Sequence, residues 1–178
     1  MTRIIAGSAG GRRLVVPPGS GTRPTADRAR EGLFSSLQSL LELQGARVLD
    51  LYAGSGAVGL EAVSRGAAGT TLVEQDPRAL AAIRSNVEVL GLAATVVDSD
   101  VSQYLATEPS PYQLVFLDPP YETDVEPVLA ALLPWLHADA VVVVERRTRG
   151  GAPAPPAQLR AERSRRYGQA SLWYFSRS

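Results

Sequence analysis

The chain has 178 residues, of which 45% are hydrophobic and 20% are charged. This length and composition fit a single domain with a sizeable core and exclude a mainly disordered chain. No apolar run approaches the roughly 18 residues of a membrane-spanning helix, and no export signal is evident, so we expect a cytoplasmic monomer without a membrane partner. The absence of Cys excludes disulfides, thiolate metal sites and thiol nucleophiles, and no metal is expected.

The net charge is zero, but it is unevenly distributed along the chain. Residues 1–30 contain six Arg and one acidic residue (+5), residues 31–145 contain four Arg and 16 acidic residues (−12), and residues 146–178 contain eight Arg and one acidic residue (+7). If the two basic ends meet in space, they form a positive face suited to phosphates, with salt-dependent binding. A solvated surface is the alternative interpretation.

The first 24 residues are predicted to form a small basic β-hairpin extension. Two strand-like runs, 3–6 and 13–16, flank the glycine-rich segment 7–11, and Pro17-Pro18 ends the pattern. Residues 25–178 then form the main domain. It begins with an amphipathic helix at 26–43, for which Thr25 is a suitable N-cap.

Strands and helices then alternate, which favours an α/β fold with a doubly wound, mainly parallel sheet. A Pro- and Gly-rich loop at 150–156 ends the alternation, and a C-terminal antiparallel hairpin closes the sheet. The predicted strands are 47–51, 70–74, 95–98, 113–117 and 140–144, the predicted helices are 56–65, 77–90, 101–106 and 125–136, and the hairpin pairs 159–166 with 169–176.

A glycine loop follows the first strand of this alternation. The sequence Asp50-Leu-Tyr-Ala-Gly-Ser-Gly-Ala-Val-Gly59 contains G-x-G-x-x-G between a strand and a helix, and Glu74 ends the next strand 20 residues after Gly54. In a Rossmann-like fold such an acid bonds ribose hydroxyls, so a nucleoside-type cofactor is predicted. A tight βα turn without a ligand is the alternative.

Asp50 discriminates between two cofactors. A carboxylate beside the loop repels the pyrophosphate of a nicotinamide dinucleotide, but it attracts the ammonium and sulfonium groups of S-adenosylmethionine. We therefore predict S-adenosylmethionine as cofactor and S-adenosylhomocysteine as product. An acid after the third strand, Asp98 or Asp100, is expected to bond the adenine amine. The candidate cofactor residues in these segments are Asp50, Ala53, Gly54, Ser55, Gly56, Glu74, Asp100 and Val101.

The motif Asp118-Pro-Pro-Tyr121 follows the strand at 113–117. In a doubly wound sheet it faces the glycine loop across the crevice at the strand ends. The prolines fix the backbone, so that Asp118 and the carbonyl of Pro119 can accept hydrogens from an exocyclic amine and make its lone pair more available. Tyr121 can stack on an extruded base. The predicted catalytic residues are Asp118, Pro119, Pro120 and Tyr121.

These motifs, together with Arg3-Ile-Ile-Ala-Gly, Gly11-Arg-Arg-Leu and residues 23–34, resemble the bacterial RsmD-type methyltransferases. The resemblance implies a class I methyltransferase that methylates N2 of a guanine, position 966, in 16S ribosomal RNA of the small ribosomal subunit. It also implies that Arg23, Pro24 and Thr25 lie near cofactor and RNA, and that the N-terminal hairpin grips the RNA backbone. The candidate RNA-binding residues are Arg12, Arg13, Arg23, Arg30, Arg165 and Arg166.

Alternatives remain within and beyond this class of enzyme. The Asp-Pro-Pro-Tyr motif is shared with enzymes that methylate adenine N6 in DNA, and a protein glutamine is another amine target. An NAD-binding oxidoreductase or a non-catalytic nucleotide-binding module would share the glycine loop. Asp50 and the absence of an obvious hydride-transfer residue disfavour the oxidoreductase.

Overall fold

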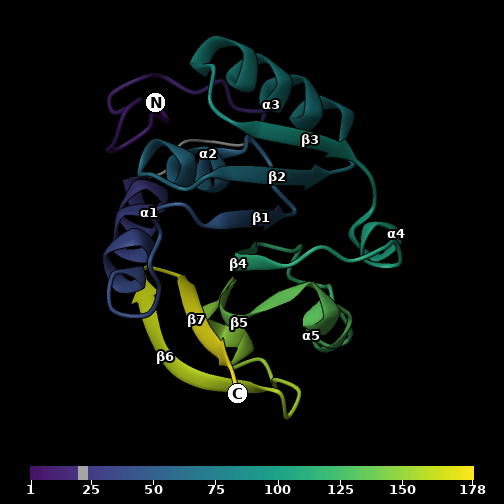
Figure 1. Cartoon of the computed structure of the whole chain (residues 1–178). Helices are drawn as coiled ribbons and strands as arrows, with labels where there is room; N and C mark the ends of the chain where they lie inside the picture. The colour runs from purple at the N-terminus through teal and green to yellow at the C-terminus, as the bar shows by residue number, and fades with distance from the viewer. Residues whose placement is uncertain (20–23) are drawn as a thin grey trace.

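The computed structural model describes residues 1–19 and 24–178 and contains one seven-stranded sheet. The strand order is β3-β2-β1-β4-β5-β7-β6, with parallel pairing from β3 to β5 and antiparallel pairing of β5 with β7 and of β7 with β6. The predicted doubly wound Rossmann-like fold with a closing hairpin is therefore confirmed (Figure 1). No helix in the described part of the chain is both long and apolar enough to span a membrane.

The elements follow the predicted order, with a few changed boundaries. They are α1 (Pro24–Leu37), β1 (Arg47–Leu51), α2 (Ala57–Ser64), β2 (Gly69–Glu74), α3 (Pro77–Leu90), β3 (Ala94–Asp98), α4 (Val101–Leu105), β4 (Tyr112–Leu117), α5 (Glu126–Leu132), η1 (Leu133–Trp135), β5 (Leu136–Arg147), η2 (Thr148–Gly150), β6 (Leu159–Tyr167) and β7 (Ala170–Arg177).

Two predicted helices are shorter than their apolar patterns. Helix α1 ends at Leu37 rather than at residue 43, because Leu40 and Leu41 donate their N–H groups to the Leu37 carbonyl in a turn and still pack on the core from there. The helix predicted at 125–136 becomes α5 followed by a 3-10 turn that contains Pro134. Proline has no N–H to continue an α-helix.

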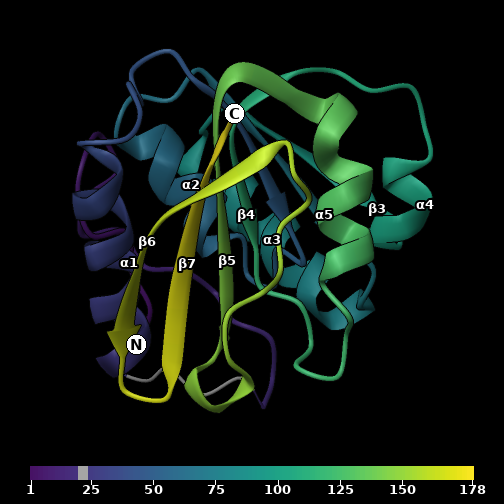
Figure 2. The ribbon, with the colours of Figure 1, turned by 90° about the horizontal axis from the view of Figure 1, so that it is seen from below.

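Helices cover both faces of the sheet. The core cluster between α1, α2 and the sheet includes Leu33, Phe34 and Tyr174, whereas α4 and α5 cover the other face, where Leu129 of α5 and Val115 of β4 belong to one cluster. Figure 2 shows α1 and α5 on opposite sides of β5 and β7. The five parallel strands all end at the same edge of the sheet. In doubly wound folds this edge is where ligands bind.

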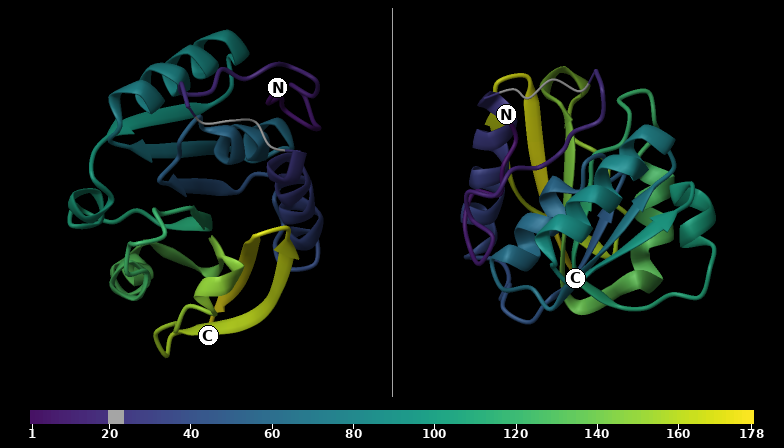
Figure 3. Two further views of the ribbon diagram at one scale, coloured as in Figure 1. Left: turned by 180° about the vertical axis from the view of Figure 1, so that it is seen from behind. Right: turned by 90° about the horizontal axis from the view of Figure 1, so that it is seen from above.

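The N-terminal segment packs on the sheet's helical layer rather than extending into solvent. Its antiparallel pairing is limited to one bridge between Arg3 and Arg13, so neither predicted run is a full strand. Ile4 and Leu14 are buried against α2 and α3. The buried Glu61 carboxylate accepts the N–H groups of residues 5 and 6 at 2.8 and 3.0 Å. Figure 3 shows this segment beside α2 and α3 from two further directions.

The arginine pairs of the two basic ends lie apart. Arg12 donates to the carbonyl of Val89 at the end of α3, whereas Arg165 and Arg166 lie on β6, the last strand at the other end of the sheet (Figure 1). The two basic segments do meet elsewhere, because the start of α1 belongs to the first segment and α1 packs against β6. RNA contacts of Arg12 and Arg165 would therefore belong to two separate patches.

Candidate active site

Two adjoining pockets open at the carboxyl ends of the parallel strands. The larger, of about 1240 Å³, extends from Glu74 at the end of β2 and Asp100 just before α4 to Asp118 and Tyr121 after β4. The smaller, of about 310 Å³, lies over the glycine loop and is also lined by residues 16 and 17 of the N-terminal segment. Both are lined by Ala26, Ala29, Tyr52, Asp118 and Glu145, so they form one continuous site.

The conformation of the glycine loop depends on its glycines and on hydrogen bonds to Glu74. Gly54 and Gly56 have φ values of 60° and 79°, a conformation that side chains rarely adopt. Glu74 accepts the N–H of Gly54 at 2.8 Å with one oxygen, and the N–H groups of Gln75 and Asp76 at 2.9 Å with the other. The carboxylate thereby ties the loop to the start of α3.

Gly59 allows α2 to pack directly on the sheet. A Cβ at this position would lie 2.5 Å from side-chain atoms of Leu72 and Thr70. The same close approach brings the N–H of Gly59 to 2.9 Å from Oδ2 of Asp50, which is 1% exposed. Burial raises the pKa of Asp50 well above its usual range, and nearby Asp118 and Glu74 raise it further, against the Gly59 hydrogen bond. This end of the site favours a cation over an anion.

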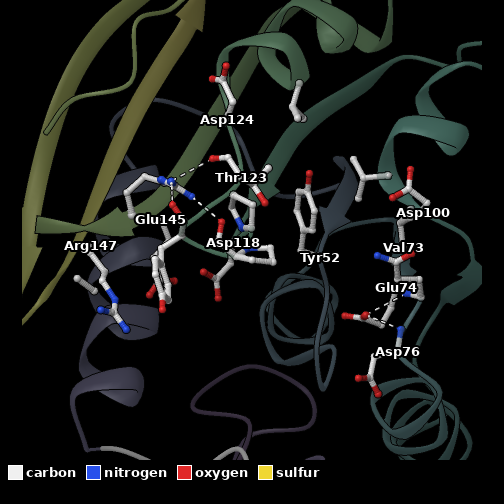
Figure 4. A pocket seen from close by; sticks show the side chains of 18 of the residues that line it. Tyr52, Val73, Glu74, Asp76, Asp100, Asp118, Thr123, Asp124, Glu145 and Arg147 are labelled. Carbon is white, nitrogen blue, oxygen red and sulfur yellow. Dashed lines mark hydrogen bonds between the residues drawn. The ribbon is translucent and has the colours of Figure 1, made fainter. Parts of the chain in front are cut away.

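Tyr52 is the non-glycine residue of the described chain with a positive φ, 58°. A bulky residue in this conformation is strained and needs support from its surroundings. The strained turn brings the Tyr52 ring between the acids of the cofactor side and those of the Asp118 side (Figure 4). Burial is the main cause of its raised phenol pKa. Tyr52 thus separates the two halves of the site.

Two carboxyl groups lie together at the carboxyl ends of β4 and β5, one directly after β4 and one near the end of β5. Because Leu117 pairs with Val144, the next residues, Asp118 and Glu145, are neighbours at the pocket (Figure 4). Asp118 is exposed on one side. Desolvation of its carboxyl by the surrounding protein nevertheless raises the pKa of Asp118 to about 6, and the positive charge of Arg146 opposes this rise. Burial, and then the charge of Asp118, raise the pKa of Glu145 to about 8. At neutral pH, Asp118 is therefore ionised and Glu145 protonated.

Arg146 fixes the Asp-Pro-Pro-Tyr loop from the adjacent strand. Its guanidinium donates to the carbonyls of Pro120 (3.1 Å), Tyr121 (2.7 Å) and Thr123 (3.2 Å). Three charge-assisted bonds hold the backbone that follows Asp118, and they come from a planar group that fits carbonyls well. The Pro119 carbonyl is not among the acceptors of Arg146.

Tyr121 is 63% exposed, and its ring is covered on one face by the guanidinium of Arg147 at 4.1 Å. A large exposed aromatic at a pocket rim offers a stacking surface for another flat group. The geometry is compatible with the role in base stacking that the motif predicted.

Five of the remaining cofactor candidates line the pockets, whereas Gly56 lines neither of them. Asp100 and Val101 line the larger pocket and Asp98 does not, and Asp100 also caps α4 by accepting the N–H of Gln103. Ala53, Gly54 and Ser55 line the smaller pocket. Pro24 and Thr25 are the first residues of α1, and Arg23 lies outside the described residues.

The arginine candidates divide into exposed and buried residues. Arg12, Arg13, Arg165 and Arg166 are exposed. Arg30 is only 6% exposed, lies 3.8 Å from Glu61 and 3.4 Å from Asp27, and donates to the carbonyl of Arg3. Arg30 thus holds the N-terminal segment and lines the smaller pocket, and its contact with RNA stays a prediction.

Sequence reasoning left out three residues that shape the site: Tyr52, Arg146 and Asn86. The amide of Asn86, on α3, accepts the N–H of Val15 and donates to the carbonyls of Val15 and Ser55, so it joins the N-terminal segment to the glycine loop. Position at a strand end was a usable signal for Tyr52 and Arg146. No sequence signal marked Asn86, because its role depends on a contact with Val15, which lies 71 residues away in the sequence.

Comparisons with known proteins cover nearly the whole chain. Residues 2–176 match the family described as Conserved hypothetical protein 95. Ribosomal RNA small subunit methyltransferase D of Escherichia coli (strain K12) is 39% identical over 179 residues, covering 98% of this chain and 89% of that protein. The solved structure of the Escherichia coli protein yhhF has a TM-score of 0.89 at 37% identity, covering 99% of this chain and 97% of that one. A hypothetical protein from Thermus thermophilus has a TM-score of 0.80 at 31% identity, covering 98% of both chains.

Proposed function

This chain belongs to the RsmD family, as its motifs predicted, and from this premise we propose that it transfers a methyl group from S-adenosylmethionine to the exocyclic N2 amine of a guanine in 16S ribosomal RNA. The relative in Escherichia coli is named as a methyltransferase of small-subunit ribosomal RNA. The proposed partner is accordingly the small ribosomal subunit or its RNA.

The observation that carries the proposal is the position of Asp118. Its carboxyl lines both pockets, one over the glycine loop and one open to the exposed Tyr121. A group at this junction can contact a methyl donor and a target amine at the same time. Positioning two reactants in this way supplies a large part of the rate enhancement of a group transfer.

The residues of the smaller pocket fit the proposed cofactor. Burial is the main cause of the raised pKa of Asp50, and the charges of Asp118 and Glu74 raise it further, so these two carboxyl groups make the field there negative. A negative field suits an ammonium and a sulfonium. Gly54 and Ser55 line the space without bulky side chains. Asp50 and the glycine loop would hold the methionine end, and Glu74 and Asp100 the ribose and adenine. Bound S-adenosylmethionine supplies an electrophilic methyl group.

The chain's own groups would activate the amine. Asp118, ionised at neutral pH, and the carbonyl of Pro119 accept its two hydrogens and orient the nitrogen lone pair. Arg146 keeps the loop carbonyls in place while this happens. Tyr121 stacks on the extruded guanine. A carboxylate with a pKa of about 6 is also suited to take up the proton that the amine loses.

The test is methyl transfer from labelled S-adenosylmethionine into small-subunit particles, naked ribosomal RNA, DNA and protein, followed by nucleoside analysis. The proposal expects N2-methylguanosine in ribosomal RNA with the wild type and none with Asp118→Ala. Label in DNA adenine or in protein glutamine would instead support one of the alternative amine targets. Calorimetry with S-adenosylmethionine and with NAD distinguishes a methyltransferase from an NAD-dependent enzyme.

A further inference from the structure

A third pocket, of about 340 Å³, lies beside the active site where β5 ends and the β6–β7 turn returns. It is lined by Arg147, Thr148, Arg149, Arg166 and Gln169. Three of its five lining residues carry a guanidinium and none carries a carboxylate. Arg147 and Gln169 also line the pocket that contains Asp118 and Tyr121, so the two spaces adjoin.

The backbone around this pocket is well braced. Thr148 donates its N–H to the carbonyl of Gln169 at 2.8 Å, and its hydroxyl lies 2.9 Å from that of Ser171. Arg166, which lines the pocket, donates from Nε to the carbonyl of Gly168 at 3.0 Å. These contacts join η2 to the β6–β7 turn and bring arginines from two distant parts of the sequence together.

The positive charge of this pocket is uncompensated by ion pairs. Within residues 1–19 and 24–178, the ion pairs engage Arg30, Arg65, His137 and Arg160, and not Arg147, Arg149 or Arg166. Three guanidiniums held near one another without a counter-charge favour an anion with several acceptor oxygens, which guanidinium geometry matches best in phosphate and carboxylate. The adjoining catalytic pocket is acidic and cannot provide this contact.

We propose that Arg147, Arg149 and Arg166 form a phosphodiester-binding pocket that holds the RNA backbone next to the target nucleotide. This inference rests on the proposed function, because it assigns the RNA a place relative to Asp118. Arg147 connects base stacking with backbone binding. Its guanidinium covers the Tyr121 ring at 4.1 Å, and the residue also lines the third pocket. A base that stacks on Tyr121 places its own phosphodiester backbone beside the three arginines. Their positive charge then offsets the repulsion between the RNA and the acidic catalytic pocket.

The test uses Arg149→Gln and Arg166→Gln, singly and together, in the full-length protein. The matched control is Arg160→Gln, an exposed arginine at the opposite end of β6 that pairs with Glu162. Both test residues are exposed, so the fold is expected to persist, and thermal unfolding checks this. The double variant should raise KM for small-subunit RNA about 10-fold, with kcat within about twofold of wild type. The slope of log binding constant against log salt should fall by about 1 for each arginine that contacts a phosphate.

A KM and a salt slope equal to those of Arg160→Gln would overturn the proposal. So would tight binding of inorganic phosphate to the wild type together with an unchanged KM for RNA in the double variant, because the pocket would then serve a free anion. RNA titration does not require turnover. If the wild type binds RNA but methylates none, the proposed function fails, while the salt slopes still decide whether these arginines contact the backbone.

Discussion

Asp118 and Glu145 lie side by side because Leu117 and Val144 are paired in the parallel register of β4 and β5. The two carboxyl groups share one end of the pocket but titrate differently, with pKa values of about 6 and about 8. The pair can therefore present one charged acceptor and one neutral, hydrogen-donating acid at neutral pH. In enzymes generally, the surroundings of two neighbouring carboxyl groups can give them different pKa values and therefore different roles.

The first prediction concerns the pH dependence of activity. Asp118 must be ionised to accept amine hydrogens, so kcat/KM should fall as the pH drops through about 6 and level off above it. Arg146→Ala removes the favourable charge that lowers this pKa, so the acid limb should move to higher pH. The profile is measured as methyl transfer to RNA between pH 5 and 9. An acid limb near the ordinary carboxyl pKa in both proteins would exclude this role of Asp118.

The second prediction concerns stability and Glu145. A carboxyl whose folded pKa is raised from 4.5 to about 8 stabilises the fold below its unfolded pKa, and this contribution is lost as the pH rises through about 8. Glu145→Gln cannot ionise, so it should be more stable than wild type at pH 9 by about 1 to 3 kcal/mol and should differ little from it at pH 5. Urea unfolding at both pH values measures the difference. Equal pH dependence of the two proteins would contradict the raised pKa.

The third prediction concerns Glu74 and the glycine loop. Glu74→Ala removes the acceptor of the Gly54 N–H and of two further N–H groups, so the loop should loosen and S-adenosylmethionine binding should weaken by about 1 to 3 kcal/mol. Calorimetric titration gives the affinity. Glu88→Gln, an exposed change on α3, is the control and should bind like wild type. Unchanged affinity in Glu74→Ala would remove Glu74 from the proposed cofactor site.

The fourth prediction concerns the N-terminal segment. Glu61 is fully buried, accepts two backbone N–H groups of this segment and pairs with Arg65 at 2.8 Å. Glu61→Ala leaves these partners unpaired and should lower the free energy of unfolding by about 3 to 5 kcal/mol. Because residues 16 and 17 line the smaller pocket, cofactor affinity should fall as well. Chemical unfolding and calorimetry test the two effects separately, and a variant as stable as wild type would show that Glu61 does not hold the segment.

The fifth prediction concerns the basic patch near α3. Charge reversal at the exposed Arg12 and Arg13 should weaken RNA binding and flatten its salt slope by about 1 for each phosphate that is no longer neutralised, with cofactor affinity unchanged. The measurement is RNA titration at several salt concentrations. Because Arg12 lies at α3 and the Arg165 and Arg166 pair lies on β6 at the other end of the sheet, the two effects should add. Slopes identical to wild type would mean that these arginines are only a solvated surface.

The sequence by itself determined the layered fold and the motifs at its strand ends. Alternating apolar runs, Pro77 at the start of α3 and the glycines of the loop act over short stretches of chain, so their local preferences are readable without coordinates. The same locality predicted that Asp118 faces the glycine loop, because parallel strands in a doubly wound sheet end at one edge. Each of these inferences needs only the order of the elements.

Only the tertiary structure decided which charged groups are buried and which are free. Arg30 and Arg166 are both arginines in basic segments, but α2 places Glu61 against the first and the β6–β7 turn leaves the second open beside Arg149. Likewise, the register of β4 and β5 places Glu145 beside Asp118. Burial and pairing depend on contacts between residues far apart in sequence, and the free energy of a charge depends on those contacts rather than on its sequence neighbours.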